Sequence, residues 1–484
     1  MEKRSHIPPF IVSLIPVLFL LLVLTLVVIT QGALSVGDYS PFVLLLSALL
    51  AFLLARRYTK RKLRVYLIGL LKSIRQTAPT IPVLIFIGMI GATWMFGGIV
   101  PTCIYYGVKF INPDYFLVCI CLICSVMSVL TGSSWTTCAT IGVASMSVGQ
   151  ILGFHPGWIA GAVISGAYFG DKISPLSDTT VLASNTNGVP LFKHVQFLMT
   201  TTVPTMTITL IVFAIAGFTT DITTSDEHSQ IIGKLQEIFY ISPWLMLAPV
   251  ITCIMIAMRV NVSLTLTVST VMGFVSFWAF QDGIIGTLLG ANPHIMDYIK
   301  LSLQMLFYIT TIDTGNDFLN GLVDTSGVYG MLPTVYLVVS ASIFGGMMLG
   351  SGMITSIVQH GLSHIKGTTR IVAAAAGSGL FLNSCTGDQY LSVVLDSNLF
   401  RALFRRNNIP PKVLSRTVED SVSVTSVLIP WNSCGLTQST VLGVPTLTYL
   451  PFCIFNYLSP IMTVTVTAIT TYLISRAKMR RQKQ

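Results

Sequence analysis

The sequence predicts an all-α polytopic membrane protein with roughly 11–14 transmembrane segments, some of them broken helices or re-entrant hairpins. Two observations support this prediction. Of the 484 residues, 53% are hydrophobic and only 10% are charged, whereas a soluble domain carries about 25% charged residues. Apolar runs also recur from one end of the chain to the other, separated by short polar clusters. A soluble fold is therefore excluded.

The first expected span is the apolar run at residues 10–29, which follows Lys3 and Arg4. A signal peptide would have a shorter apolar core and a small-x-small cleavage site after it. The run is too long and lacks such a site. We therefore expect it to be retained as a transmembrane helix.

The net charge of +10 comes from short basic clusters between apolar runs, not from one continuous basic face. This pattern argues against nucleic-acid binding and fits the excess of Lys and Arg on the cytoplasmic side of membranes. We expect a cell-membrane protein with both termini cytoplasmic, and we place the acidic loop 219–240 outside. The basic clusters lie at residues 3–4, 56–64, 366–370, 401–416 and 476–483.

Several of the later apolar runs contain only 13 to 16 residues and are flanked by Gly, Ser and Pro. A single-pass helix needs about 20 apolar residues, so these runs predict half-helices or re-entrant hairpins. The expected runs after the first lie near residues 40–55, 80–100, 115–130, 136–152, 157–170, 198–218, 242–258, 262–280, 298–312, 333–349, 371–386, 388–404, 418–432 and 446–475.

A short echo between the two halves predicts a two-fold internal repeat, expected to be of the inverted type. Gly132 and Ser133 are matched at an offset of 218 residues, and Gly170 and Asp171 at an offset of 217. Coincidence competes with this reading, because Gly and Ser are abundant. The predicted units are an N-terminal hairpin with its basic loop at 1–64, repeats at 65–240 and 241–475, and a basic tail at 476–484.

Asp171, Lys172 and Asp178 interrupt an otherwise apolar chain around Pro175. Unpaired at the centre of a membrane helix, the three charges would together cost about 8 to 10 kcal/mol. Proline breaks the helix, and we expect the freed carbonyl oxygens to coordinate a cation beside the carboxylates. The alternatives are that Asp171 pairs with Lys172 and that Asp178 caps the next helix.

The predicted site combines this stretch with polar clusters from both halves. For Glu419 and Asp420, complementing a helix dipole is an equally good reading. The candidate ion- and proton-binding residues are Asp171, Ser174, Asp178, Thr179, Asp388, Glu419 and Asp420, with sodium held at Asp171 and Asp178. The candidate cavity residues are Ser133, Ser134, Thr136, Lys172, Gln389 and Asn432.

Other polar features do not indicate a catalytic or cofactor site. The CxxC formed by Cys121 and Cys124 lies within an apolar run, so we expect buried helix residues. No zinc, haem or nucleotide motif occurs in the sequence, and we expect no cofactor and no enzymatic activity. The roles of Asp313, Asp317, Asp324 and Asp396 are left open.

Five strings resemble the NhaC family of sodium/proton antiporters, in order, from about residue 75 to 465. The strings span residues 131–135, 166–180, 386–391, 415–421, and 429–432 with 443–446. The most specific is the Gly-Asp-Lys-Ile-Ser-Pro-Leu-Ser-Asp-Thr string at 170–179. The chain departs from the family pattern at Asp396-Ser397-Asn398 and at Ser421-Val422-Ser423.

The resemblance implies exchange of sodium for protons by alternating access. Its implied alternatives are a coupled antiporter for malate, lactate or another organic acid, or for an amino acid. An ion channel is the alternative from another class. The expected partners are a small inorganic cation, a small organic anion in the second case, and membrane lipids, and a homodimer is left open.

Overall fold

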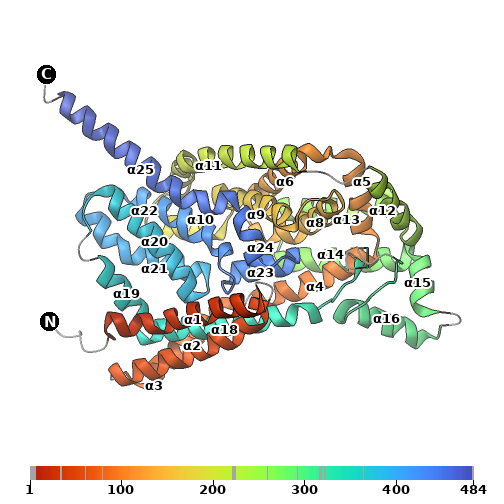
Figure 1. Ribbon diagram of the computed structural model, residues 1–484, viewed down its shortest axis with the longest axis horizontal. Coiled ribbons are helices and arrows are strands. Elements are labelled where there is room, and N and C mark those ends of the chain that lie inside the picture. The colour runs from red at the N-terminus through yellow and green to blue at the C-terminus, as the bar shows by residue number, and fades with distance from the viewer. Residues whose placement is uncertain are drawn as a thin grey trace.

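The computed structural model describes residues 7–32, 35–59, 61–78, 80–220, 225–258, 260–290, 293–315, 319–320, 323–362 and 365–481. Every regular element in these residues is a helix (Figure 1), apart from an isolated bridge between Thr310 and Thr325. This confirms the predicted all-α class. Asp317, Lys3, Arg4, Lys60 and the last three residues of the predicted tail lie outside the described residues.

The helices of the first half are α1 (Phe10–Gln31), α2 (Val36–Tyr58), α3 (Leu63–Thr77), α4 (Thr80–Phe96), α5 (Ile99–Phe110), α6 (Phe116–Thr131), α7 (Ser134–Thr137), η4 (Cys138–Gly142), α8 (Val143–Ile151), α9 (Pro156–Ile173), α10 (Asp178–Thr186), α11 (Leu191–Thr219) and α12 (Ser225–Ile238). Those of the second half are α13 (Leu247–Ala257), α14 (Val262–Phe280), α15 (Asp282–Leu289), α16 (Ile295–Phe307), α18 (Leu332–Ser351), α19 (Met353–Leu362), α20 (Thr368–Thr386), α21 (Gln389–Arg406), α22 (Pro411–Val418), η7 (Glu419–Ser423), α23 (Ser433–Leu442), α24 (Thr446–Tyr449) and α25 (Ile454–Arg481).

Among the described residues, seven helices are long and apolar enough to cross a membrane, and two bent helix pairs raise the number to nine. The bent pairs are Ile81–Phe96 with Ile99–Phe110, at 67°, and Ile232–Ile238 with Pro243–Ile256, at 92°. The chain is therefore a multi-pass membrane protein. Shorter elements such as α10, with nine residues, lie between the long helices. They are the interrupted segments that the sequence predicts.

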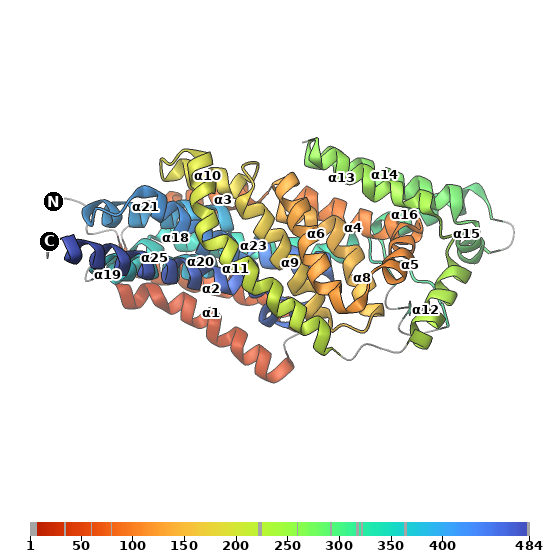
Figure 2. The same cartoon turned by 90° about the horizontal axis from the view of Figure 1, so that it is seen from above.

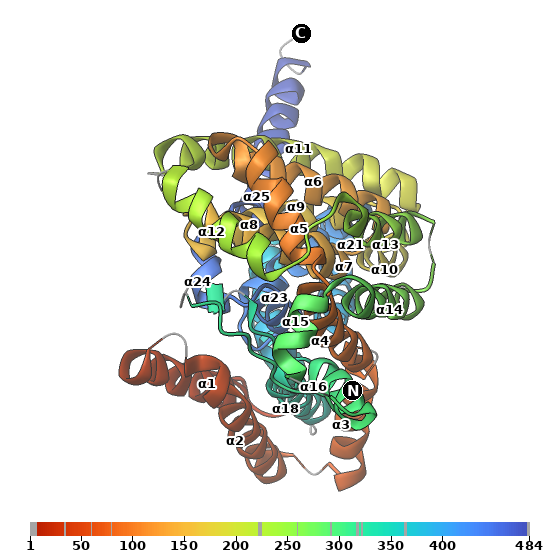
Figure 3. The same cartoon turned by 90° about the vertical axis from the view of Figure 1, so that its right-hand side faces the viewer.

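The long helices form layers around the short ones. α1 and α2 pack against each other at one side of the molecule (Figure 3), and α2 and α3 pack on α18. α13 and α14 run together along the opposite edge when the molecule is seen from above (Figure 2). α9 and α23 lie near the middle of the long axis, whereas α20, α21 and α22 lie toward one end (Figure 1).

α6 and α9 make the most extensive helix contact of the fold because small residues let their backbones approach closely. A Cβ atom added to Gly166 would lie 2.2 Å from the carbonyl oxygen of Cys121, and one added to Gly170 would lie 2.4 Å from that of Ser125. Cys121 and Cys124 are fully buried free thiols in α6. The prediction that they are buried helix residues is confirmed.

Two regions of the chain have the same order of backbone features at a constant separation of 255 residues. In each, a helix ends at a left-handed glycine, and a capping residue starts the next helix. A later helix starts with proline, breaks at a second proline and resumes at another cap. The pairs are Gly132 and Gly387, Ser133 and Asp388, Pro156 and Pro411, Pro175 and Pro430, Ser177 and Asn432, Gly188 and Gly443, and Pro190 and Pro445.

The structure does not support the sequence echo at offsets of 217 and 218. That echo pairs Gly132, which ends a helix, with Gly350, which lies inside α18. It also pairs Gly170, inside α9, with Gly387, which ends α20. Short Gly-Ser and Gly-Asp matches occur by chance, whereas a positive φ angle or a proline break marks a specific backbone position.

We expect Gly166→Val to destabilise the protein, because a side chain cannot fit between α9 and the α6 backbone. Overpacking costs typically about 1–3 kcal/mol, and more where backbone must move. The thermal unfolding midpoint of the purified protein measures the loss. Gly91→Ala is the matched control, since an added Cβ there meets no atom within 4 Å. Equal midpoints for both variants would contradict the close packing.

Candidate functional site

The helix break after α9 follows from Pro175, which has no backbone N–H. Ser174 is extended, with φ −74° and ψ 125°, and its hydroxyl donates to the Val129 carbonyl oxygen at 2.7 Å. The Ser177 hydroxyl accepts from the Thr180 N–H at 3.4 Å and caps α10. α9 and the short helix α10 therefore meet at a fixed polar turn, with Asp178 at the first position of α10.

The carbonyl oxygens of Asp171 and Lys172, beside the break, accept hydrogen bonds from α10 and the turn. The Thr180 hydroxyl lies 3.0 Å from the Lys172 oxygen and 3.3 Å from the Asp171 oxygen. The Asp171 oxygen also accepts from the Ser174 N–H at 3.2 Å. Both oxygens therefore already accept hydrogen bonds, and their expected coordination of a cation stays a prediction.

The Asp171 carboxylate joins this break to the turn after α6. Its Oδ2 accepts from the Ser134 N–H at 3.1 Å and from the Ser134 hydroxyl at 2.7 Å. The two turns also touch, since a Cβ on Gly132 would lie 2.7 Å from the Leu176 carbonyl carbon. Gly132 also has a φ of +65°, a conformation that favours glycine. The two interruptions therefore form one structural unit.

A polar cavity of about 1020 Å³ lies against this unit. It receives side chains from the turn after α6, from the break after α9, from the start of α21, and from α13 and α14. Asp178 is exposed within the lining, while Asp171 is 9% exposed. The lining is Val83, Thr131, Gly132, Ser133, Trp135, Thr136, Asp171, Leu176, Ser177, Asp178, Thr179, Leu182, Ile256, Val260, Asn261, Thr265, Gln389, Tyr390 and Val394.

Six of the residues predicted from the sequence lie together at this cavity. They supply carboxylate, hydroxyl and amide oxygens, which are the ligands that hard cations prefer. No Lys or Arg side chain is among the described lining residues. The six are Ser133, Thr136, Asp171, Asp178, Thr179 and Gln389.

A cluster of buried charges lies behind the cavity. Lys172 forms an ion pair with Asp420 on η7, and its Nζ donates to the Ser459 hydroxyl at 2.9 Å. Arg416 Nε lies 3.9 Å from Asp420, and its side chain is 3% exposed. Glu419 Oε1 accepts from the Thr179 hydroxyl at 3.2 Å. Thr179 therefore links the cavity to this cluster.

The remaining predicted residues have structural contacts instead of positions in the cavity lining. Asp388 caps α21, since its Oδ1 accepts from the Leu391 N–H at 2.7 Å. Asn432 caps α23 through the Cys434 N–H at 3.1 Å. Ser174 and Ser134 hold the two turns described above, and Lys172 points into the charge cluster. Six of the predicted residues thus lie in the cavity lining, and the other seven lie outside it.

Sequence reasoning missed the contribution of α13 and α14 to the cavity. Asn261 and Thr265, at the start of α14, line it. Asn261 also caps α14, with Oδ1 accepting from the Ser263 N–H at 2.9 Å. An Asn between two apolar runs is the only signal in the sequence, and it is equally typical of a cap. Tyr390 was missed although it adjoins Gln389.

The acidic stretch near residue 313 forms a loop and is absent from the cavity lining among the described residues. Asp313 Oδ1 accepts from the Gly315 N–H at 2.9 Å, and Asp324 Oδ1 accepts from the Ile312 N–H at 3.3 Å. The Gly315 N–H, with help from Asn320, holds the pKa of the exposed Asp313 carboxyl below its usual range. These carboxylates shape the loop.

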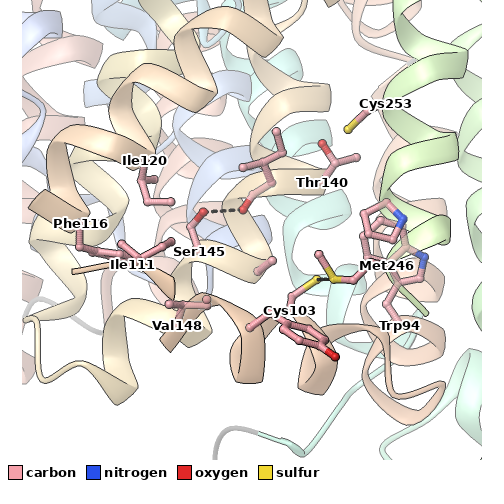
Figure 4. A pocket seen from close by; sticks show the side chains of 15 residues that line it. Trp94, Cys103, Ile111, Phe116, Ile120, Thr140, Ser145, Val148, Met246 and Cys253 are labelled. Atoms are coloured by element: carbon pink, nitrogen blue, oxygen red, sulfur yellow. Dashed lines mark hydrogen bonds between the residues drawn. The ribbon is translucent and has the colours of Figure 1, made fainter. Parts of the chain in front are cut away.

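A second pocket, of about 320 Å³, is apolar (Figure 4). Trp94, Cys103 and Met246 face it, and the Cys103 thiol donates to the Met246 sulfur at 3.6 Å. No charged side chain is among its described lining residues. A bare cation would have no oxygen-rich coordination there, so the polar cavity is the better candidate site. The described residues also contain no group of three or more His, Cys, Asp or Glu that could hold a metal ion.

Comparison with known proteins shows which family the chain belongs to. The model of the Na⁺/H⁺ antiporter family matches residues 7–181 and 166–469. The chain belongs to the Na⁺/H⁺ antiporter family. Among this family, the Na⁺/H⁺ antiporter NhaC of Alkalihalophilus pseudofirmus is 36% identical over 382 residues, covering 79% of this chain and 80% of that protein.

Two relatives from Bacillus subtilis extend the comparison within the antiporter family. Its Na⁺/H⁺ antiporter NhaC is 32% identical over 400 residues, covering 82% of this chain and 85% of the relative. Its malate-2H⁺/Na⁺-lactate antiporter is 32% identical over 382 residues, covering 78% of each chain. These named relatives are transport proteins.

We expect Asp420→Asn to destabilise this antiporter-family chain strongly, because it leaves Lys172 and Arg416 buried without their shared carboxylate. Breaking a buried ion pair from one side costs about 3–5 kcal/mol. The thermal unfolding midpoint reports the effect, and the double variant Asp420→Asn/Lys172→Met should recover part of the loss.

Lys300→Met is the control for that experiment, since Lys300 pairs with Asp297 at 3.8 Å with its side chain 71% exposed. An exposed pair contributes about 0–1 kcal/mol. If Asp420→Asn cost no more than this control, the charge cluster would not be a buried ion pair.

Proposed function

We propose that this protein is a secondary transporter that exchanges sodium for protons across the cell membrane by alternating access. The observation that carries the proposal is the pair of carboxylates, Asp171 and Asp178, on either side of one helix break in one polar cavity. The NhaC relatives, which are named Na⁺/H⁺ antiporters, support the same exchange. The transported sodium ion and proton need no resident cofactor.

Competition between sodium and a proton for the same oxygens explains the exchange. A carboxylate that is partly shielded from water either binds a proton or stays ionised beside a cation. Asp178 is the exposed partner, and the Thr179 hydroxyl lies beside it in the lining. Sodium arriving at Asp178 and Asp171 therefore displaces protons, and protons displace sodium. If the cavity faces one side at a time, this competition is sufficient for obligatory exchange.

We assign the two regions with matching breaks to the two halves of an internal repeat, which corrects the register of the sequence echo. The first half supplies Asp171 and Asp178, and the second supplies Gln389 and Tyr390 to the same cavity. Broken helices in corresponding positions of two halves are typical of a transporter's binding site. The division into repeats at residue 240, the cytoplasmic termini and a homodimer remain predictions.

We expect Asp178→Asn to abolish sodium-dependent proton flux, because the amide neither binds a proton nor carries the charge that holds sodium. Everted membrane vesicles with a preset pH gradient measure this flux when sodium is added. The matched control is Asp282→Asn, at an exposed position on α15, which should transport normally. Intact flux in Asp178→Asn would show that the site lies elsewhere.

The rival function is exchange of an organic acid, which the malate-2H⁺/Na⁺-lactate antiporter relative suggests. Such a substrate needs a cation or free amide beside the site, and the three candidates are already engaged. Lys172 pairs with Asp420. The Gln389 amide donates to the Ser423 carbonyl oxygen at 2.9 Å, and its Oε1 accepts from the Cys434 thiol at 3.0 Å. Asn432 caps α23. These contacts favour the inorganic cation.

The candidate substrates can be distinguished by adding each one alone to proteoliposomes that hold a pH gradient. We expect sodium to dissipate the gradient and malate, lactate or an amino acid to leave it unchanged, because the described lining offers no positive charge. Dissipation by malate without sodium would overturn the assignment. Sodium conductance without any counter-ion would indicate a channel instead.

A further inference from the structure

Asp396 is a buried carboxylate that forms no ion pair with any residue the structure describes. It lies on α21 with an exposed fraction of 0%. Neither of its oxygens accepts a hydrogen bond from a described residue. The ion pairs among the described residues involve other carboxylates, namely Asp420 and Asp297. Asp396 therefore differs from Asp171, Asp388 and Asp420, each of which has at least one donor.

Among the described residues, no Lys, Arg or His side chain forms an ion pair with Asp396. α21 packs against α20, α10, α22 and η7. The Ser378 hydroxyl on α20 interacts with it electrostatically, outside hydrogen-bond geometry. The next residue, Ser397, accepts from the Asn187 amide at 2.9 Å, so that amide is already engaged. The titratable and charged groups on the packed helices are Arg370, Cys385, Asp178, Lys412, Arg416, Glu419 and Asp420, and those on α21 itself are Tyr390, Arg401, Arg405 and Arg406.

Burial without an ion pair determines the protonation of this group. An ionised carboxylate removed from water and left unpaired carries a very large free-energy penalty, and a protein group in that position takes up a proton instead. An ionised Asp396 would also have to survive in a packed interface between membrane helices, where unpaired charge is rare. The carboxyl is thus neutral in this conformation.

α21 connects Asp396 to the transport cavity. Val394, on the same helix, lines the cavity. Asp396 follows two residues later, and residues on an α-helix are rotated by about 100° each, so the two side chains lie on opposite sides of α21. Gln389 also lines the cavity, and because it precedes Asp396 by seven residues, about two helical turns, these two side chains share one face of α21. Asp396 therefore lies about 10 Å along the helix from Gln389, in a part of α21 where it is fully buried. A displacement of α21 that changes the cavity also changes the packing around this carboxyl.

We propose that Asp396 is a second proton-binding group, separate from the cation cavity, that holds a proton in the present conformation and releases it to water when α21 moves. Its coupling to transport rests on the proposed sodium/proton exchange, whereas its protonation does not. The sign follows from linkage: the conformation that binds the extra proton is favoured at low pH and loses that advantage as pH rises. Alkaline pH therefore promotes movement of α21.

Infrared difference spectroscopy tests the protonation directly, whichever ion is transported. At neutral pH we expect the protein to show the carbonyl stretch of a protonated carboxyl group that is missing in Asp396→Asn. Asp282→Asn, at an exposed position, should keep the band. An identical spectrum for Asp396→Asn and the unchanged protein would overturn the proposal. So would failure of this variant to fold, since an amide has nearly the shape of a neutral carboxyl.

The pH profile of sodium-driven proton flux tests the coupling. One proton shifts a conformational equilibrium by up to about tenfold per pH unit. We expect Asp396→Asn to transport at low pH and to lose up to one unit of slope in log rate against pH on the alkaline side. Loss of the infrared band with an unchanged pH profile would overturn the coupling. Absence of sodium-driven flux in the unchanged protein would instead refute the proposed function.

Discussion

The ion pair between Lys172 and Asp420 is the interaction on which the arrangement of this protein depends. Charges buried between membrane helices persist only when they are paired or face water. Asp171 and Lys172 are consecutive residues at the end of α9, and the chain satisfies them in opposite ways. Asp171 borders the cavity, whereas Lys172 reaches Asp420 on η7. The end of α9 thereby contributes Asp171 to the cavity lining and, through Lys172, contacts the second half of the chain.

The polar groups of the two turns are stable inside the protein because they form hydrogen bonds with one another. Asp171 accepts from the first turn of α7, and the hydroxyl of Thr180 covers the carbonyl oxygens left open by Pro175. Irregular backbone in a membrane protein is tolerated where it is buried in protein or lines a wet cavity, and here both conditions hold. Thr179, between the cavity and Glu419, adds a further contact between the two halves, because its hydroxyl donates to the Glu419 carboxylate.

The sequence predicts the membrane class, the break at Pro175 and the carboxylates beside it, because composition and proline act locally. It does not predict which way a polar side chain points. Asp388 and Asn432 follow a glycine or proline break, a pattern that fits a cavity ligand and a helix cap equally well. Lys172 beside Asp171 suggests a local pair, yet its partner is on η7, far along the chain. The match between the two regions was missed because it lies in backbone conformation, with α6 ending at Gly132 and α20 ending at Gly387, both left-handed.

The length of α25 relates the protein to the thickness of its membrane. With 28 residues, it is about 42 Å long at 1.5 Å per residue, against about 30 Å of hydrocarbon. Its C-terminal part extends beyond the other helices (Figures 1 and 3). Ile469 and Leu473 are exposed there, followed by Arg476. An arginine near the end of a transmembrane helix reaches toward the membrane interface, so this projecting part has the composition of a helix end that leaves the hydrocarbon region.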